Sequence, residues 1–176
     1  DPLYFSTFGN TNPPGVAGTA DDADLYFWSG TAFSRVFDAT TAGVPGGANV
    51  DGFDRVDATH FYLSFLNDVT IAGLGTVQDE DIVYYNNGAW SVYFDGTAQG
   101  LTAANQDIDA FSINGGVLYF STFGNTNPLG VGGTADDSDI YSWNGSAFTR
   151  VFDATTAGVP GGANVDGFDR VDATHF

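Results

Sequence analysis

Nine aspartates recur at equivalent positions of the sequence, and they are its strongest candidates for chemistry. Residues two apart in an extended segment point to the same side, so a D-x-D pair offers two carboxylates together. Such groups suit calcium, which binds oxygen ligands. The pairs are Asp22 and Asp24, Asp79 and Asp81, and Asp137 and Asp139, and a further Asp opens a later apolar run at Asp51, Asp109 and Asp166. The pattern predicts calcium binding at these residues, with turn capping and solubility as the alternative.

Apart from the aspartates, the sequence offers few candidate binding or catalytic residues. The aromatic positions Trp28, Tyr85 and Trp143 recur beside a tight turn, where they either form an inter-sheet core or offer a weak carbohydrate-stacking platform. No Ser-His-Asp order or Gly-rich phosphate loop stands out, so we expect no catalytic residues and no enzyme. The absence of cysteine excludes disulfides and thiolate metal sites.

The charge balance limits the possible partners. The chain carries 22 acidic residues, four arginines and no lysine, for a formal net charge of -18. Nucleic-acid binding needs cations that replace counterions, so nucleic acid is excluded as a partner. No apolar run is long enough to span a bilayer, and we expect no membrane span.

The chain is internally repetitive. Residues 3–61 match residues 118–176 at 51 of 59 positions, and a diverged copy lies between them. We therefore divide the chain into repeat unit 1 (1–60), repeat unit 2 (61–117) and repeat unit 3 (118–176), the last a near-copy of the first. A fixed period of this length is typical of stacked structural repeats.

Each unit contains four short runs with the alternation of β-strands. We label them B, C, D and A in chain order. Run A of one unit is expected to form the first strand of a sheet whose other strands are runs B, C and D of the next unit. They are expected at 3–8, 24–28, 33–37 and 50–56 in unit 1, and at 61–66, 81–85, 90–94 and 108–113 in unit 2. Connections C–D and A–B are tight turns, whereas B–C and D–A are long. Alternate connections of a meander lie at the same end of the sheet, so both long loops and their aspartates should share one face.

These features predict an all-β fold of tandem four-stranded antiparallel sheets arranged like β-propeller blades, with tandem β-sandwiches as the alternative. The elements L-Y-F-S, V-D-G-F, D-x-D-[IL] and F-D-[AG]-T resemble propeller-type repeats of secreted bacterial surface proteins. The D-x-D loops are also loosely similar to calcium-binding integrin-type blades, although the consecutive D-x-D-x-D-G loop of those blades is missing. The resemblance implies an extracellular or cell-surface location, and no activity.

Three blades are too few for the propellers usually seen, which have four or more. We expect the A run at 165–171 to complete the first sheet of another copy, giving a closed dimer or a filament, unless the chain is a segment of a longer propeller. The predicted function is a calcium-stabilised extracellular scaffold or adhesion module that binds itself or a surface protein. A lectin-like glycan binder is the alternative, and a propeller hydrolase or lyase is less favoured.

Overall fold

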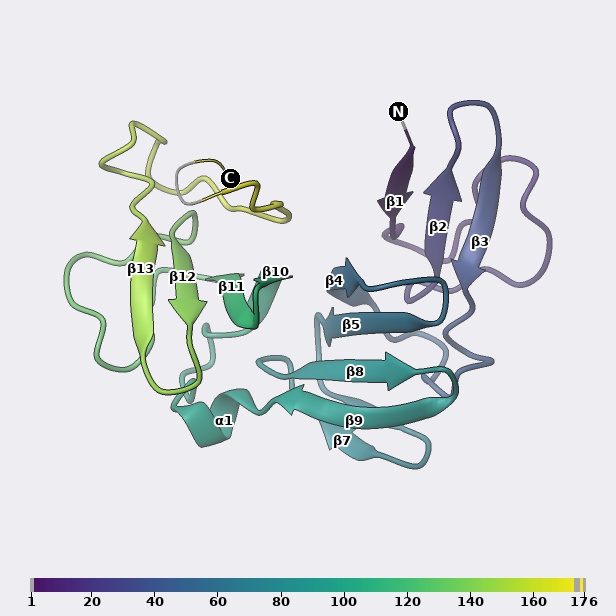
Figure 1. Ribbon diagram of the computed structural model, residues 1–176, viewed down its shortest axis with the longest axis horizontal. Helices are drawn as coiled ribbons and strands as arrows, with labels where there is room; N and C mark the ends of the chain where they lie inside the picture. Colours follow the sequence, from purple (N-terminus) through teal and green to yellow (C-terminus); the bar gives the residue numbers. More distant parts are fainter. Residues whose placement is uncertain (1, 173–174, 176) are drawn as a thin grey trace.

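The computed structural model describes residues 2–172 and residue 175, and it shows an all-β protein with 37% strand and 2% helix. Three main antiparallel sheets lie around a common middle, where β4 and β10 face each other (Figure 1). The prediction of an all-β chain built from several antiparallel sheets is therefore confirmed.

The sheets follow the chain in order. The first contains β1 (Leu3–Phe5), β2 (Leu25–Trp28) and β3 (Phe33–Phe37). The second contains β4 (Val50–Arg55), β5 (His60–Phe65), β8 (Ile82–Asn86) and β9 (Ala89–Phe94), and the third contains β10 (Ile108–Asn114), β11 (Val117–Thr122), β12 (Ile140–Trp143) and β13 (Phe148–Phe152). Each of the two four-stranded sheets thus begins with the last strand of the preceding repeat unit.

Two small elements were not expected from the sequence. The hairpin of β6 (Val69–Ile71) and β7 (Gly75–Val77) lies in the long B–C connection of the second sheet. The helix α1 (Gly96–Gln99) lies in the next D–A connection, where the Asp95 carboxylate caps it by accepting a hydrogen bond from Ala98 N.

The expected strand at 165–171 is wrong for the described residues, because this segment takes part in no ladder. Its sequence is identical to that of residues 50–56, which form β4 and the residue after it. The difference is the ladder: β4 pairs with β5, whereas 165–171 hydrogen-bonds to no strand in a ladder among the described residues. A strand needs a ladder partner for its backbone groups, so the same sequence forms no strand here.

Two apolar cores join the sheets face to face. Leu25 and Phe37 of the first sheet pack with Leu63 and Phe65 of the second. The second sheet also packs against the third, because Phe94 belongs to the core that contains Phe120 and Tyr141. The middle sheet therefore shares a core with both neighbours, unlike a sheet that belongs to a separate sandwich.

Candidate functional site

The beginnings of the three A-type segments converge on one pocket. Asp51, Asp109 and Asp166 all line it, although each belongs to a different repeat unit. The sequence predicted each of these aspartates beside the D-x-D pair of its own unit. The structure instead places them next to one another across units, in the middle of the molecule.

Burial and mutual repulsion perturb this aspartate group. Burial raises the pKa of Asp51 to about 7, and the charges of Asp109, Asp166 and Asp107 add to the rise. The pKa of Asp109 is also raised, chiefly by burial, with an opposing hydrogen bond from Asn164 and a further increase from Asp166. Loss of hydration and nearby negative charges both destabilise the ionised carboxylate, so its pKa rises.

Asp109 is the most enclosed member of the group. Its side chain is 4% exposed, and its Oδ2 atom is buried with no hydrogen-bond partner among the described residues. A buried carboxylate oxygen without a donor is costly to a fold, which makes it an unusual feature of the pocket.

The sequence interpretation missed the residues two positions earlier in each A-type segment. Asn49 and Asn164 line the same pocket, and Asp107 acts on the pKa of both Asp51 and Asp109. Asn164 Nδ2 donates a hydrogen bond of 2.8 Å to Asp166 Oδ1. The signal that could have found these residues is their repeat position, because each unit reads Asn-x-Asp or Asp-x-Asp here.

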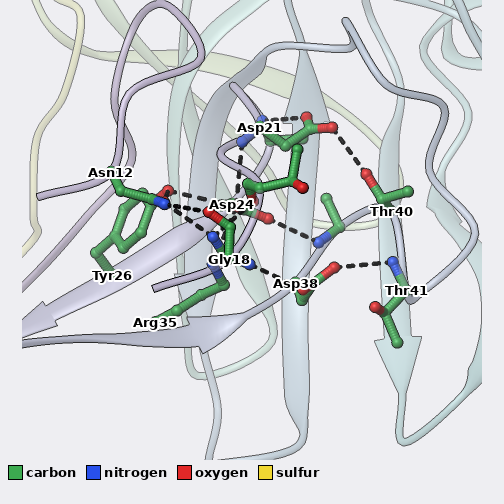
Figure 2. A network of polar contacts seen from close by, with 12 residues as sticks. Asn12, Gly18, Asp21, Asp24, Tyr26, Arg35, Asp38, Thr40 and Thr41 are labelled. Atoms are coloured by element: carbon green, nitrogen blue, oxygen red, sulfur yellow. Dashed lines mark hydrogen bonds and ion pairs between the residues drawn. The ribbon is translucent and has the colours of Figure 1, made fainter. Parts of the chain in front are cut away.

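The second aspartate of each D-x-D pair lies elsewhere, in a network that joins the two long loops. Figure 2 shows this network around Asp24. Asp24 is 1% exposed and accepts hydrogen bonds from the backbone N–H groups of Asp21 and Ala39. Arg35 Nε lies 3.1 Å from Asp24 Oδ2, and the Tyr26 hydroxyl donates to the same oxygen at 3.3 Å. Asp24 is therefore a structural anchor whose oxygens are already surrounded by donors.

This anchor recurs in the other two sheets. Asp139 accepts from Asp136 N and Ala154 N and pairs with Arg150 at 3.1 Å. In the second sheet Asp81 accepts from Gln78 N and Gly96 N, and Val92 stands at the arginine position. The network confirms that the B–C and D–A loops meet at one end of each sheet.

The first aspartate of each pair lies beside an A-type segment. The carbonyl of Asp22 accepts a hydrogen bond from Val50 N at 3.4 Å, and that of Asp79 accepts from Ile108 N at 3.2 Å. Burial raises the pKa of Asp79 to about 7, with contributions from Glu80, Asp107 and Asp68. One side-chain oxygen each of Asp22 and Asp137 is buried and unpartnered among the described residues.

The recurrent aromatics pack against neighbouring rings. Trp28 lies 4.4 Å from Phe33 between ring centroids, and Trp143 lies 4.5 Å from Phe148. Tyr85 packs on the core between the first two sheets, 5.1 Å from Phe37. All three are partly buried in these contacts.

As placed, no three His, Cys, Asp or Glu side chains of residues 2–172 and 175 are gathered into a group that could hold a metal ion. Over the same residues, no helix is long and apolar enough to cross a membrane.

Comparison with known proteins returns no match to a family model, to a curated protein or to a solved structure.

Proposed function

We propose that this chain is a non-enzymatic structural module of the cell exterior, made of blade-like sheets that join edge to edge with a second copy. The observation that carries the proposal is the pairing of β1. Its counterparts β5 and β11 each pair on both edges, whereas β1 pairs only with β2 among the described residues. Unpaired strand edges are templates for another strand.

The free edge of β1 faces a pocket of about 480 Å³. All three β1 residues and the following Ser6 line this pocket. Successive side chains of a strand point to opposite faces of the sheet. A pocket that consecutive residues line therefore lies along the edge of the strand and not over one face. The donors and acceptors of that edge are therefore directed at the pocket.

The complementary element is segment 165–171, which joins no ladder among the described residues. It carries the sequence of β4 and its next residue, and after it Val171 N and Asp172 N donate to His175 O at 3.0 and 3.3 Å. The turn after β4 has the same two bonds, from Val56 N and Asp57 N to His60 O, at the same lengths. The segment thus has the sequence that receives a B-type strand in β4, and β1 is a B-type strand that pairs on one edge only among the described residues.

The β4–β5 register predicts how the two elements pair. Arg55 lies opposite Phe61 in that ladder, and the corresponding residues here are Arg170 and Leu3. Residues 166–169 of the same chain also line the pocket beside β1. Closure within one chain would nevertheless make a ring of three sheets, fewer than propellers typically have, so a second copy is the occupant we favour. Two copies joined at two such edges make a six-sheet ring with two-fold symmetry.

Disulfide trapping tests the pairing, because the chain has no cysteine of its own. Leu3→Cys protein is mixed with Arg170→Cys protein under mild oxidation and resolved on a non-reducing gel. We expect a covalent heterodimer in preference to either homodimer, since directly opposed positions bring Cβ atoms within disulfide range.

The matched control is the double variant Asn114→Cys/Val117→Cys, whose positions pair inside the β10–β11 hairpin and should give only an internal bond. The double variant Leu3→Cys/Arg170→Cys, with both changes in one chain, distinguishes pairing between two copies from closure within one chain. A monomer with an internal disulfide would show closure within one chain and overturn the second-copy proposal. Absence of any specific disulfide would overturn the pairing, and would leave further units of a longer chain as the occupants of both edges.

A further inference from the structure

We propose that the three A-type segment beginnings together form one calcium site, to which each repeat unit contributes the same two oxygen-bearing side chains. The six residues are Asn49 and Asp51, Asp107 and Asp109, and Asn164 and Asp166. This site differs from one in which each unit holds its own ion, and it does not depend on the joining of two copies.

The backbone presents each pair to the same side. Residues two apart in an extended segment point alike, and the residue between them points away. The intervening Val50 is 4% exposed and Ile108 is 0% exposed, both within the apolar cores. Five of the six oxygen-bearing residues line the pocket, and the sixth, Asp107, lies close enough for its charge to raise the pKa of Asp51 and Asp109.

The independent sign of a ligand is the isolated oxygen of Asp109. This side chain is more than nine-tenths buried, lines the pocket, and leaves Oδ2 without a hydrogen-bond partner among the described residues. A cation in the pocket would satisfy that oxygen and offset the repulsion between Asp109 and its neighbours Asp51 and Asp166.

The donor set selects the ion. Four carboxylates and two amide carbonyls supply only oxygen, the ligand of hard cations. Calcium accepts six to eight such ligands in flexible geometry, whereas magnesium needs a near-ideal octahedron and keeps several waters. Ligands from three separate segments are easier to fit to the flexible ion.

Binding requires one movement. The aspartates are not gathered closely enough to hold an ion as placed. Asn164 and Asp166 are exposed and belong to no ladder among the described residues, so they can shift with less loss of backbone hydrogen bonding than Asp51 in β4 or Asp109 in β10. Calcium should therefore draw residues 164–166 onto the two buried contributors and order them.

Calorimetric titration of calcium chloride into the full chain tests the site. We expect one ion per chain, a rise in Tm that a chelator reverses, and protection of the amides near residue 166 from hydrogen exchange. Asp109→Asn retains the shape of the side chain but removes its charge, and it should weaken binding about tenfold or more. Because this change also relieves repulsion, the variant should fold without calcium.

Two variants serve as comparisons. Asp57→Asn alters an exposed turn carboxylate outside the pocket and should bind calcium as the unaltered chain does. Asp22→Asn alters a residue that a separate site within unit 1 would use, and it should change the affinity less than threefold. Three ions per chain, no bound ion, or unchanged affinity in Asp109→Asn would each overturn the proposal.

Discussion

The Asp54 carboxylate in β4 accepts a hydrogen bond of 2.7 Å from the backbone N–H of Ile113 in β10. It thereby joins the second sheet to the third at the edges that face each other in the middle of the molecule (Figure 1). We expect Asp54→Ala to lower the free energy of unfolding by about 1–3 kcal/mol, because the Ile113 N–H loses its acceptor. Asp54→Asn retains an acceptor oxygen and should cost less. Urea denaturation of both variants measures the difference, and equal losses would contradict this role.

The same carboxyl group should make stability depend on pH. Burial raises the pKa of Asp54 above its ordinary 3.8, opposed by the Ile113 hydrogen bond and reinforced by the charge of Asp169. Tyr62 and Tyr93 are the other ionisable neighbours, and both are neutral below pH 9. The folded chain binds this proton more tightly than the unfolded chain. The resulting stabilisation is present below pH 3.8 and is lost as the pH rises through the raised pKa.

Asp54→Asn removes this dependence. The stability of the variant relative to the unaltered chain should therefore increase between pH 4 and pH 7, as measured by denaturation at each pH. A constant difference across this range would show that Asp54 titrates alike in the folded and unfolded chains.

The Asp24 anchor should be among the most sensitive positions. Asp24→Ala leaves Arg35, 14% exposed, without its buried partner and removes the acceptor of two backbone N–H groups. Loss of one partner of a buried pair typically costs about 3–5 kcal/mol. Arg35→Val should cost less, since Val92 stands at this position in the second sheet, where Asp81 is held by backbone donors alone. A larger loss from Arg35→Val would argue that the arginine, and not the aspartate, organises the loops.

Glu80 and Gly96 are matched in size. A Cβ atom built on Gly96 would lie 2.8 Å from Glu80 Cβ and closer still to its carbonyl oxygen and Cγ. The first sheet has Ala23 and Ala39 at these positions, and both are fully buried. Gly96→Ala should therefore destabilise the chain by about 1–3 kcal/mol. Adding Glu80→Ala should recover part of the loss, as thermal unfolding would show.

Gly132→Ala is the matched control, because a Cβ atom there meets nothing within 4 Å. It should leave Tm nearly unchanged. If Glu80→Ala and Gly96→Ala instead destabilise additively, the two positions do not compensate each other.

Much of the fold was accessible from periodicity. The alternation at residues 33–37 predicted β3 with its observed bounds, and the tight turns predicted which strands pair. The sequence of 165–171 was read as a strand because it matches β4, but a ladder depends on a neighbour that no local pattern encodes. The helix α1 was missed because a single capped turn of four residues gives no helical periodicity.

The sequence predicted which aspartates belong to the candidate site, but it did not predict that aspartates of different repeat units lie together. The sequence identified Asp51, Asp109 and Asp166 as equivalent positions, but the spacing within a unit favoured partners from the same unit. Their contact across units depends on how the sheets pack around the middle, which rests on cores such as that joining Phe94 to Phe120. The recurrent D-x-D spacing predicts Asp24 as a ligand alongside them, whereas its burial among donors depends on the loops that fold around it in three dimensions.

The displacement of each sheet from its repeat unit by one strand has a consequence for how such chains can change in length. A stretch that runs from one B strand to the next, as residues 3–61 do, contains three strands of one sheet and the first strand of the following sheet, and residues 118–176 nearly repeat its sequence. Inserting or deleting one such stretch leaves every interior sheet fully stranded and every A–B hairpin covalently intact. Recombination between near-identical copies therefore lengthens or shortens the array by whole sheets, and the protein encoded after each event keeps complete interior sheets.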